Sequence, residues 1–168
     1  GVERVAHSIA KELGGDVFYL RYGKKCEDPL YVNYRRRYVR SFILGRFYLP
    51  FPSKVLFKIL FSANPLIVHL PCPTILILAL LSRILRPKRF ICIYWHSFIH
   101  PSFDLTGYLE YCYQFIALII VKFFPLIVTS PILEKTFILK GFCSENINIL
   151  PCCIPSDIEH FYDGINKN

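Results

Sequence analysis

The chain has 168 residues, 54% hydrophobic and 16% aromatic, which excludes a disordered chain and fits one ordinary globular domain. Eight glycines and twelve prolines exclude collagen-like and low-complexity classes. The formal net charge is +8, and the ten basic and two acidic residues between Arg21 and Lys58 account for the whole excess. A charge concentrated in this way favours an anionic partner, although a solvated basic face without a partner gives the same pattern.

In chain order, the hydrophobic pattern predicts a helix over 2–13, a strand over 16–22 and an extended segment over 30–43. The pair Gly14-Gly15 is typical of a helix end, and Pro50 and Pro52 interrupt the chain before a short helix over 55–61. From residue 66 onward, continuously apolar strands alternate with helices. The predicted strands are 66–70, 89–95, 126–129 and 147–150, and the predicted helices are 73–85, 108–123 and 132–139.

This alternation predicts an α/β fold, a Rossmann-like doubly wound parallel sheet with helices on both faces. Such a sheet normally begins with a strand, whereas this chain opens on a helix. We therefore expect that a first, central strand precedes residue 1. The expected domain covers residues 1–155, and the polar residues 156–168 are interpreted as the start of a linker to a second domain that is not in this chain.

Two apolar stretches, 74–85 and 115–129, resemble membrane spans. The first is shorter than the roughly 20 residues that a bilayer requires, and Lys122 and Pro125 interrupt the second. Both are interpreted as buried helices and strands. The seven cysteines form no CxxC pair, and several lie in apolar runs, which indicates reduced thiols in a cytosolic protein. No Cys/His spacing resembles a zinc site.

Polar side chains follow the predicted strands at the edge where open α/β sheets bind ligands. His69 lies in the sequence His-Leu-Pro, His96 and Ser97 end the sequence Tyr-Trp-His-Ser, and Ser130 lies in the sequence Val-Thr-Ser-Pro. We expect these side chains to converge on one edge of the sheet. Each of them also has a simpler interpretation: His69 and His96 as structural histidines, Ser130 as the N-cap of the next helix, and Ser97 in a similar capping role.

These segments, in this order, resemble the N-terminal domain of family 4 glycosyltransferases with the GT-B fold. The opening Gly-Val-Glu-Arg at residues 1–4 resembles the start of that family's first helix. Residues 69–71, 94–97, 128–131 and 150–154 resemble the family's later strand ends, and the resemblance covers the whole chain. At the last of these, Cys152 and Cys153 stand where the family has Asn-Gly.

The resemblance implies a role for each of these residues. His96 would be the catalytic histidine beside the donor sugar, and Gly1 would belong to the loop that binds the donor diphosphate at a helix N-terminus. His69, Ser97 and Ser130 would line the acceptor cleft. A membrane-facing surface would include a set of basic side chains: Arg35, Arg36, Arg37, Arg40, Lys54 and Lys58.

The implied function is transfer of a hexose from a nucleotide-sugar to an acceptor, with retention at the anomeric carbon. The expected acceptor is a lipid-linked or other glycan at the cytosolic face of an anionic membrane, and the protein would be peripheral there. We expect no metal, no cofactor beyond the donor substrate and no nucleic-acid partner. Without its donor domain this chain alone would be an inactive fragment. The alternatives are a non-catalytic Rossmann-like subunit that docks on a membrane or on a donor-binding chain, and a nucleotide-sugar epimerase of the same fold.

Overall fold

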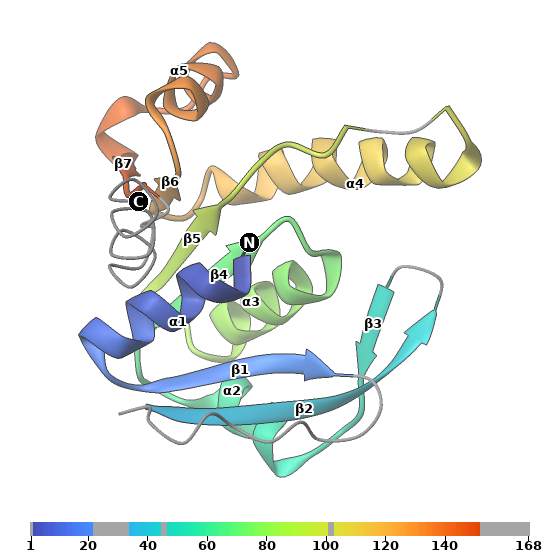
Figure 1. The fold of residues 1–168 in the computed structure, drawn as a ribbon, viewed down its shortest axis with the longest axis vertical. Helices are drawn as coiled ribbons and strands as arrows, with labels where there is room; N and C mark the ends of the chain where they lie inside the picture. Colours follow the sequence, from blue (N-terminus) through green and yellow to red (C-terminus); the bar gives the residue numbers. More distant parts are fainter. Residues whose placement is uncertain (1, 22–33, 45–46, 101–102, 152–168) are drawn as a thin grey trace, which may run out of the picture.

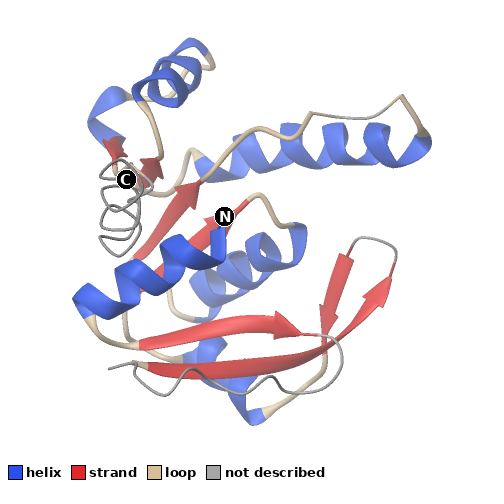
Figure 2. Ribbon diagram, viewed as in Figure 1, coloured by secondary structure: helices blue, strands red, loops and turns tan. Residues whose placement is uncertain are grey.

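The computed structural model of this chain describes residues 2–21, 34–44, 47–100 and 103–151. Helices and strands alternate along most of this length, as Figure 1 and Figure 2 show. The helices are α1 (Val2–Leu13), α2 (Lys54–Phe61), α3 (Pro73–Leu85), α4 (Leu105–Val121) and α5 (Pro131–Leu139), with a short 3-10 turn at Ser144–Asn146. The strands are β1 (Asp16–Arg21), β2 (Arg35–Leu44), β3 (Phe47–Pro50), β4 (Leu66–Leu70), β5 (Ile91–Trp95), β6 (Leu126–Val128) and β7 (Ile147–Ile149).

The second half of the chain forms a four-stranded sheet in the order β4-β5-β6-β7, with every neighbouring pair parallel. Helices connect these strands, because parallel neighbours need long crossovers. The predicted α/β class with a parallel, helix-flanked sheet is therefore confirmed for this region. Within the described residues, β1 and β4 each leave one edge without a strand neighbour. The additional strand ahead of residue 1 and the assignment to half of a GT-B fold stay predictions.

The first half of the chain forms a separate three-stranded sheet, which the sequence pattern did not predict in full. Strand β2 pairs in parallel with β1 and antiparallel with β3. The prediction treated Pro50 as a chain break, whereas it is the last residue of β3. Proline is tolerated there because β3 is an edge strand, so its missing N–H does not remove a hydrogen bond between two central strands.

The caps explain where several helices begin and end. Helix α1 stops where Gly14 adopts a φ of +68°, as the Gly-Gly pair predicted. Helix α4 begins three residues earlier than predicted, because the Asp104 carboxylate accepts a hydrogen bond from the Gly107 N–H at 2.7 Å. Ser130 caps α5 by accepting a hydrogen bond from the Leu133 N–H at 3.3 Å.

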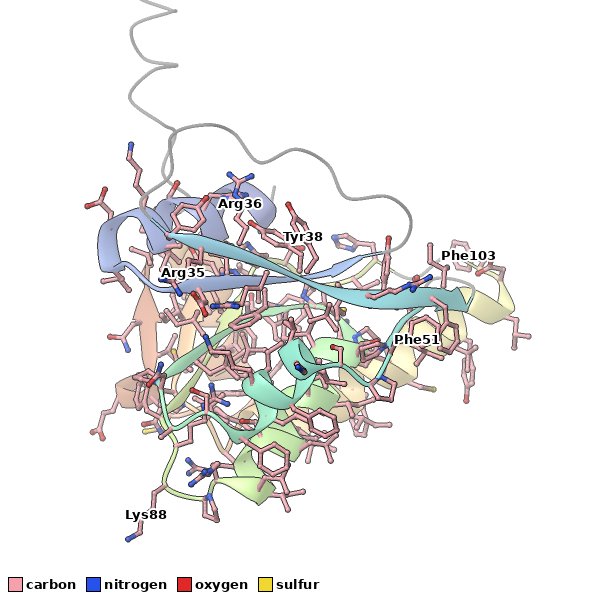
Figure 3. All side chains as sticks on the ribbon, turned by 90° about the horizontal axis from the view of Figure 1, so that it is seen from below. Arg35, Arg36, Tyr38, Phe51, Lys88 and Phe103 are labelled. Carbon is pink, nitrogen blue, oxygen red and sulfur yellow. The ribbon has the colours of Figure 1, made fainter. Side chains whose placement is uncertain are left out.

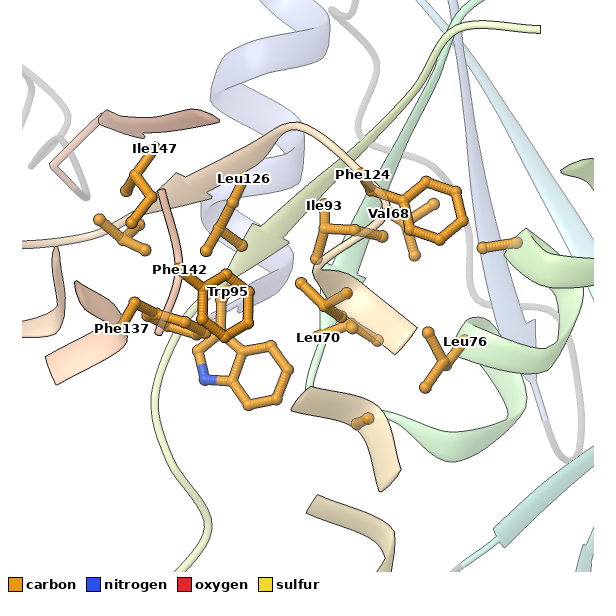
Figure 4. Close-up of a cluster of buried hydrophobic side chains, with 14 of the residues drawn as sticks. Val68, Leu70, Leu76, Ile93, Trp95, Phe124, Leu126, Phe137, Phe142 and Ile147 are labelled. Atoms are coloured by element: carbon orange, nitrogen blue, oxygen red, sulfur yellow. The ribbon is translucent and has the colours of Figure 1, made fainter. Parts of the chain in front are cut away.

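The main core lies on one face of the parallel sheet, where α3, α4 and α5 pack. Alternate residues of β5 point into it, and Trp95 at the end of that strand meets Phe137 of α5, which in turn meets Phe142 (Figure 4). Helix α1 lies on the opposite side of the molecule from α2 and α3 (Figure 3). Because side chains alternate along a strand, the other face of the parallel sheet carries the residues that point away from this core, including His69 and Tyr94.

The prediction that the two long apolar stretches are buried is wrong in part. Only one side of α3 and α4 enters the core. Ile84 of α3 is 70% exposed, and Phe115 of α4 is 60% exposed. None of the helices in the described part of the chain combines the length and the apolar character needed to cross a bilayer.

Candidate functional site

Two histidines lie side by side where β4 and β5 end. In the parallel register of these strands, His69 pairs with Tyr94 and Leu70 pairs with Trp95, so His96 follows immediately beyond the paired residues. Val68 and Leu70 enter the core, and the alternation of side chains along β4 therefore turns His69 to the other face of the sheet. The sequence predicted that these residues converge on one edge, and for the two histidines this is confirmed.

The two imidazole rings are joined by a hydrogen bond. His69 Nδ1 and His96 Nε2 lie 2.9 Å apart, and the ring centroids are 5.2 Å apart with an interplanar angle of 26°. The ring of Tyr94 stacks on His69 at 5.2 Å and contacts His96 at 4.6 Å. The histidines thus form a rigid three-ring cluster with Tyr94, whose own side chain is fully buried.

Burial keeps both imidazoles neutral. Desolvation, and to a smaller extent the neighbouring His96, lower the pKa of His69 to about 4. Desolvation likewise lowers the pKa of His96 to about 4. At pH 7 each ring therefore carries one proton, and one of these two protons occupies the contact between Nδ1 of His69 and Nε2 of His96.

This arrangement fixes what the pair offers to a ligand. Whichever ring donates in the contact, His69 Nε2 and His96 Nδ1 are the remaining nitrogens, and one of them is a donor while the other is an acceptor. A neutral donor and a neutral acceptor suit the hydroxyl groups of a sugar, which both donate and accept hydrogen bonds.

Backbone contacts hold the pair in place. The His96 N–H donates to the Leu70 carbonyl at 3.0 Å, and the Thr129 hydroxyl donates to the His96 carbonyl at 3.1 Å. The Tyr94 hydroxyl donates to the Leu150 carbonyl at 2.5 Å. The ends of β4, β5, β6 and β7 are thereby tied together around His96. Sequence reasoning assigned no role to Tyr94 or Thr129, because only the strand register reveals these contacts.

The other predicted cleft residues have different outcomes. Ser130 caps α5, which confirms the simpler interpretation of that residue. Ser97 follows His96 and is exposed. Gly1, predicted to bind the donor diphosphate, lies outside the described residues. The linker predicted at 156–168 and the cysteine pair at 152–153 lie outside them as well.

The predicted basic surface is spread over several places. Arg35 and Arg36 are neighbours on β2 and project to opposite sides of that strand, as Figure 3 shows. Arg37 and Lys58 both bind the Asp16 carboxylate, at 2.7 and 2.6 Å. Their hydrogen bonds, that of Lys58 first, outweigh desolvation and hold the pKa of Asp16 below its usual value.

The remaining basic residues of that set are exposed. The Arg40 guanidinium lies 5.8 Å from the centre of the Phe51 ring, and Lys54 begins α2. Two of the six cations, Arg37 and Lys58, are therefore bound to Asp16, and the six do not form one continuous surface. A sequence pattern of closely spaced arginines does not reveal this, because alternation along a strand separates neighbours.

Within the described ranges, no group of three or more His, Cys, Asp and Glu side chains is placed to hold a metal ion. Comparison of the chain with protein-family models, with curated proteins and with solved structures found no match. We therefore infer function from the chemistry of the histidine pair and from the fold.

The neutral histidines predict an acid-sensitive fold. The pKa of each is about 4 in the folded protein and about 6.5 when unfolded, so the unfolded chain binds more protons between these values. Stability is then complete above pH 6.5 and falls as the pH is lowered toward 4. We expect the free energy of unfolding to drop by about 2 kcal/mol between pH 7.5 and pH 5, since solvent relieves part of the charge on these half-buried rings.

Urea unfolding at pH 7.5, 6 and 5 measures this dependence. The double variant His69→Gln, His96→Gln should flatten it, while His100→Gln, which changes an exposed histidine, should leave it as in the unchanged chain. An equally steep dependence in the double variant would show that other groups cause it.

Proposed function

We propose that this chain forms the acceptor-binding side of a retaining glycosyltransferase that uses a nucleotide-sugar donor. The observation that carries the proposal is the neutral His69–His96 pair at the carboxyl ends of two adjacent parallel strands, the edge where open α/β sheets bind ligands. The sequence segments that resemble family 4 glycosyltransferases also include both histidines.

His96 has the central role in this proposal. Its Nδ1 contacts a hydroxyl of the transferred sugar and stabilises charge as the bond to the leaving diphosphate breaks. His69 positions the His96 ring through the contact at 2.9 Å, and Tyr94 fixes the plane of both rings. A neutral His96 serves this purpose because, unlike a protonated imidazole, it does not repel the positive charge that develops on the reacting sugar.

The proposed acceptor is lipid-linked and is reached at the cytosolic face of an anionic membrane, to which the protein binds peripherally. Support comes from the sequence, in which no Asp or Glu lies between Asp28 and Asp104 while basic residues are frequent. Cations such as the exposed Arg35, Arg40 and Lys54 are attracted to anionic headgroups, each by about 1 kcal/mol near the surface.

The test is a donor screen with the protein expressed from its entire reading frame. Nucleoside diphosphate sugars are supplied one at a time with a membrane lipid extract, and release of nucleoside diphosphate is followed. We expect release with one donor class only when lipid is present, and retention of the anomeric configuration in the glycolipid product by NMR. Conversion of one nucleotide-sugar into its epimer without lipid, and without net release of diphosphate, would favour an epimerase. No turnover of any donor would favour a non-catalytic subunit.

A further inference from the structure

Helices α2 and α3 together present an apolar surface. Phe57 and Phe61 of α2 are 53% and 46% exposed. Exposed apolar side chains of α3 continue this surface, which we call the α2–α3 face: Phe57, Phe61, Ile77, Leu81, Ile84 and Leu85. Single exposed apolar residues are ordinary, but six on two adjacent helices indicate a surface that is covered in use.

The helix geometry makes these six side chains one surface. Phe57 and Phe61 are four residues apart, and their rings stack with centroids 6.2 Å apart. On α3 the exposed positions recur at three- and four-residue intervals, which places them along one stripe. The opposite stripe, with Leu76 and Ala79, is buried in the core.

Polar contacts hold the C-terminal ends of the two helices together. The Arg86 guanidinium donates to the Phe61 carbonyl at 3.1 Å, and the Ser82 hydroxyl donates to the Leu60 carbonyl at 3.4 Å. Arg89 donates to the Ile59 carbonyl from the end of the same loop. The Phe61 end of α2 therefore lies beside the Leu85 end of α3, and the two apolar stripes join.

Cations lie at both ends of this surface. Lys54 begins α2, and Arg86 and Lys88 follow α3, where Lys88 projects from the end of the molecule (Figure 3). No Asp or Glu lies between Asp28 and Asp104, so neither helix contributes a carboxylate. A second copy placed on this face would bring like charges together. Exposed aromatic and aliphatic side chains bordered by cations match an anionic phospholipid surface instead.

We propose that the α2–α3 face inserts its six apolar side chains among the headgroups of an anionic phospholipid bilayer, with Lys54, Arg86 and Lys88 on lipid phosphates. This deepens the proposed function and rests on it for the lipid-linked acceptor. Helix α3 begins directly after β4, the strand that carries His69. The Ile77 end of this face is therefore the end nearer to the histidine pair, and the Leu85 end lies toward the edge of the sheet where β5 begins. The membrane-contacting residues are then mainly those of α2 and α3, and the arginines of β2 contribute less.

Vesicle co-sedimentation of the full chain tests the proposal. Vesicles of mixed phosphatidylglycerol and phosphatidylcholine are compared with vesicles of phosphatidylcholine alone. The variant Phe57→Ser, Ile84→Ser should bind the anionic vesicles at least about tenfold more weakly, because it removes two inserted side chains. The matched control Phe115→Ser, Ile119→Ser makes the same two exchanges at exposed positions of α4 and should bind within about twofold of the unchanged chain. Equal binding by both variants would overturn the proposal.

Two further measurements keep the test decisive if a variant folds poorly. Hydrogen exchange of the unchanged chain should show vesicle-dependent protection over 54–61 and 77–88 and none over 105–121. Protection of 105–121 alone would contradict the proposal. Sedimentation velocity without lipid should give a monomer, and a dimer that Phe57→Ser dissociates would assign the face to a second copy.

The failure of this proposal is distinguishable from the failure of the proposed function. If sugar transfer to a detergent-solubilised acceptor is found but anionic vesicles are not bound, only the membrane face is wrong. If vesicles are bound through the α2–α3 face but no donor is turned over, only the glycosyltransferase proposal fails.

Discussion

Replacing Phe137 with alanine should lower the free energy of unfolding by about 4 kcal/mol, the largest effect expected for a single side chain here. Phe137 is fully buried at the centre of an aromatic cluster. Its ring meets Trp95 edge-on with centroids 5.4 Å apart, and it meets Phe142 in the same way at 4.8 Å. Truncation leaves a cavity between α5 and the sheet (Figure 4), and these rings cannot fill it without leaving their rotamers.

Urea denaturation followed by far-UV circular dichroism measures this effect, with Ile138→Ala as the matched control. Ile138 is the next residue of α5 and is 41% exposed, so its truncation should cost less than about 1 kcal/mol. Similar losses in the two variants would show that α5 does not pack as described. Because Trp95 directly precedes His96, the Phe137 variant should also weaken the support of the histidine pair.

Replacing Arg89 with methionine should lower the free energy of unfolding by about 3 kcal/mol. Arg89 is 5% exposed, and burial lowers its pKa. Its guanidinium donates to the Asn64 carbonyl at 2.7 Å, to the Ser82 hydroxyl at 2.5 Å and to the Ile59 carbonyl. Methionine keeps much of the chain length but leaves these acceptors without their charged donor.

The control for this prediction is Arg83→Met, one turn from the end of α3. Arg83 is exposed and donates to a single carbonyl, that of Arg89, at 2.7 Å. We expect its replacement to cost less than about 1 kcal/mol in the same urea assay. If Arg89→Met is as mild as Arg83→Met, the guanidinium does not hold the ends of α2 and α3, and the α2–α3 face would lose its main structural support.

Much of the fold follows from local chemistry that a sequence displays. The Gly14-Gly15 pair marks the end of α1, and Ser130-Pro131 marks the start of α5, since capping and left-handed glycines are local properties. Short, largely apolar runs predict buried parallel strands over 66–70 and 89–95, and the structure has these strands at 66–70 and 91–95.

What the sequence could not predict depends on contacts between distant segments. The Tyr94 hydroxyl reaches the Leu150 carbonyl 56 residues away, and only the strand order brings them together. Neighbouring arginines of β2 lie on opposite sides of the strand because side chains alternate along it. Their close spacing in the sequence does not show this by itself. The exposure of α4 was missed because hydrophobicity predicts burial in general and does not identify which apolar side lacks a partner.

We propose that the His69–His96 pair lies at the site of sugar transfer. The most direct test compares kcat/KM of His96→Ala and His100→Ala in the donor assay, with the protein expressed from its entire reading frame. His100 is exposed and lies four residues further along the same loop. We expect His96→Ala to lower kcat/KM by about 100-fold and His100→Ala to leave it within twofold. Equal activity of the two variants would contradict the proposed role of His96 in sugar transfer.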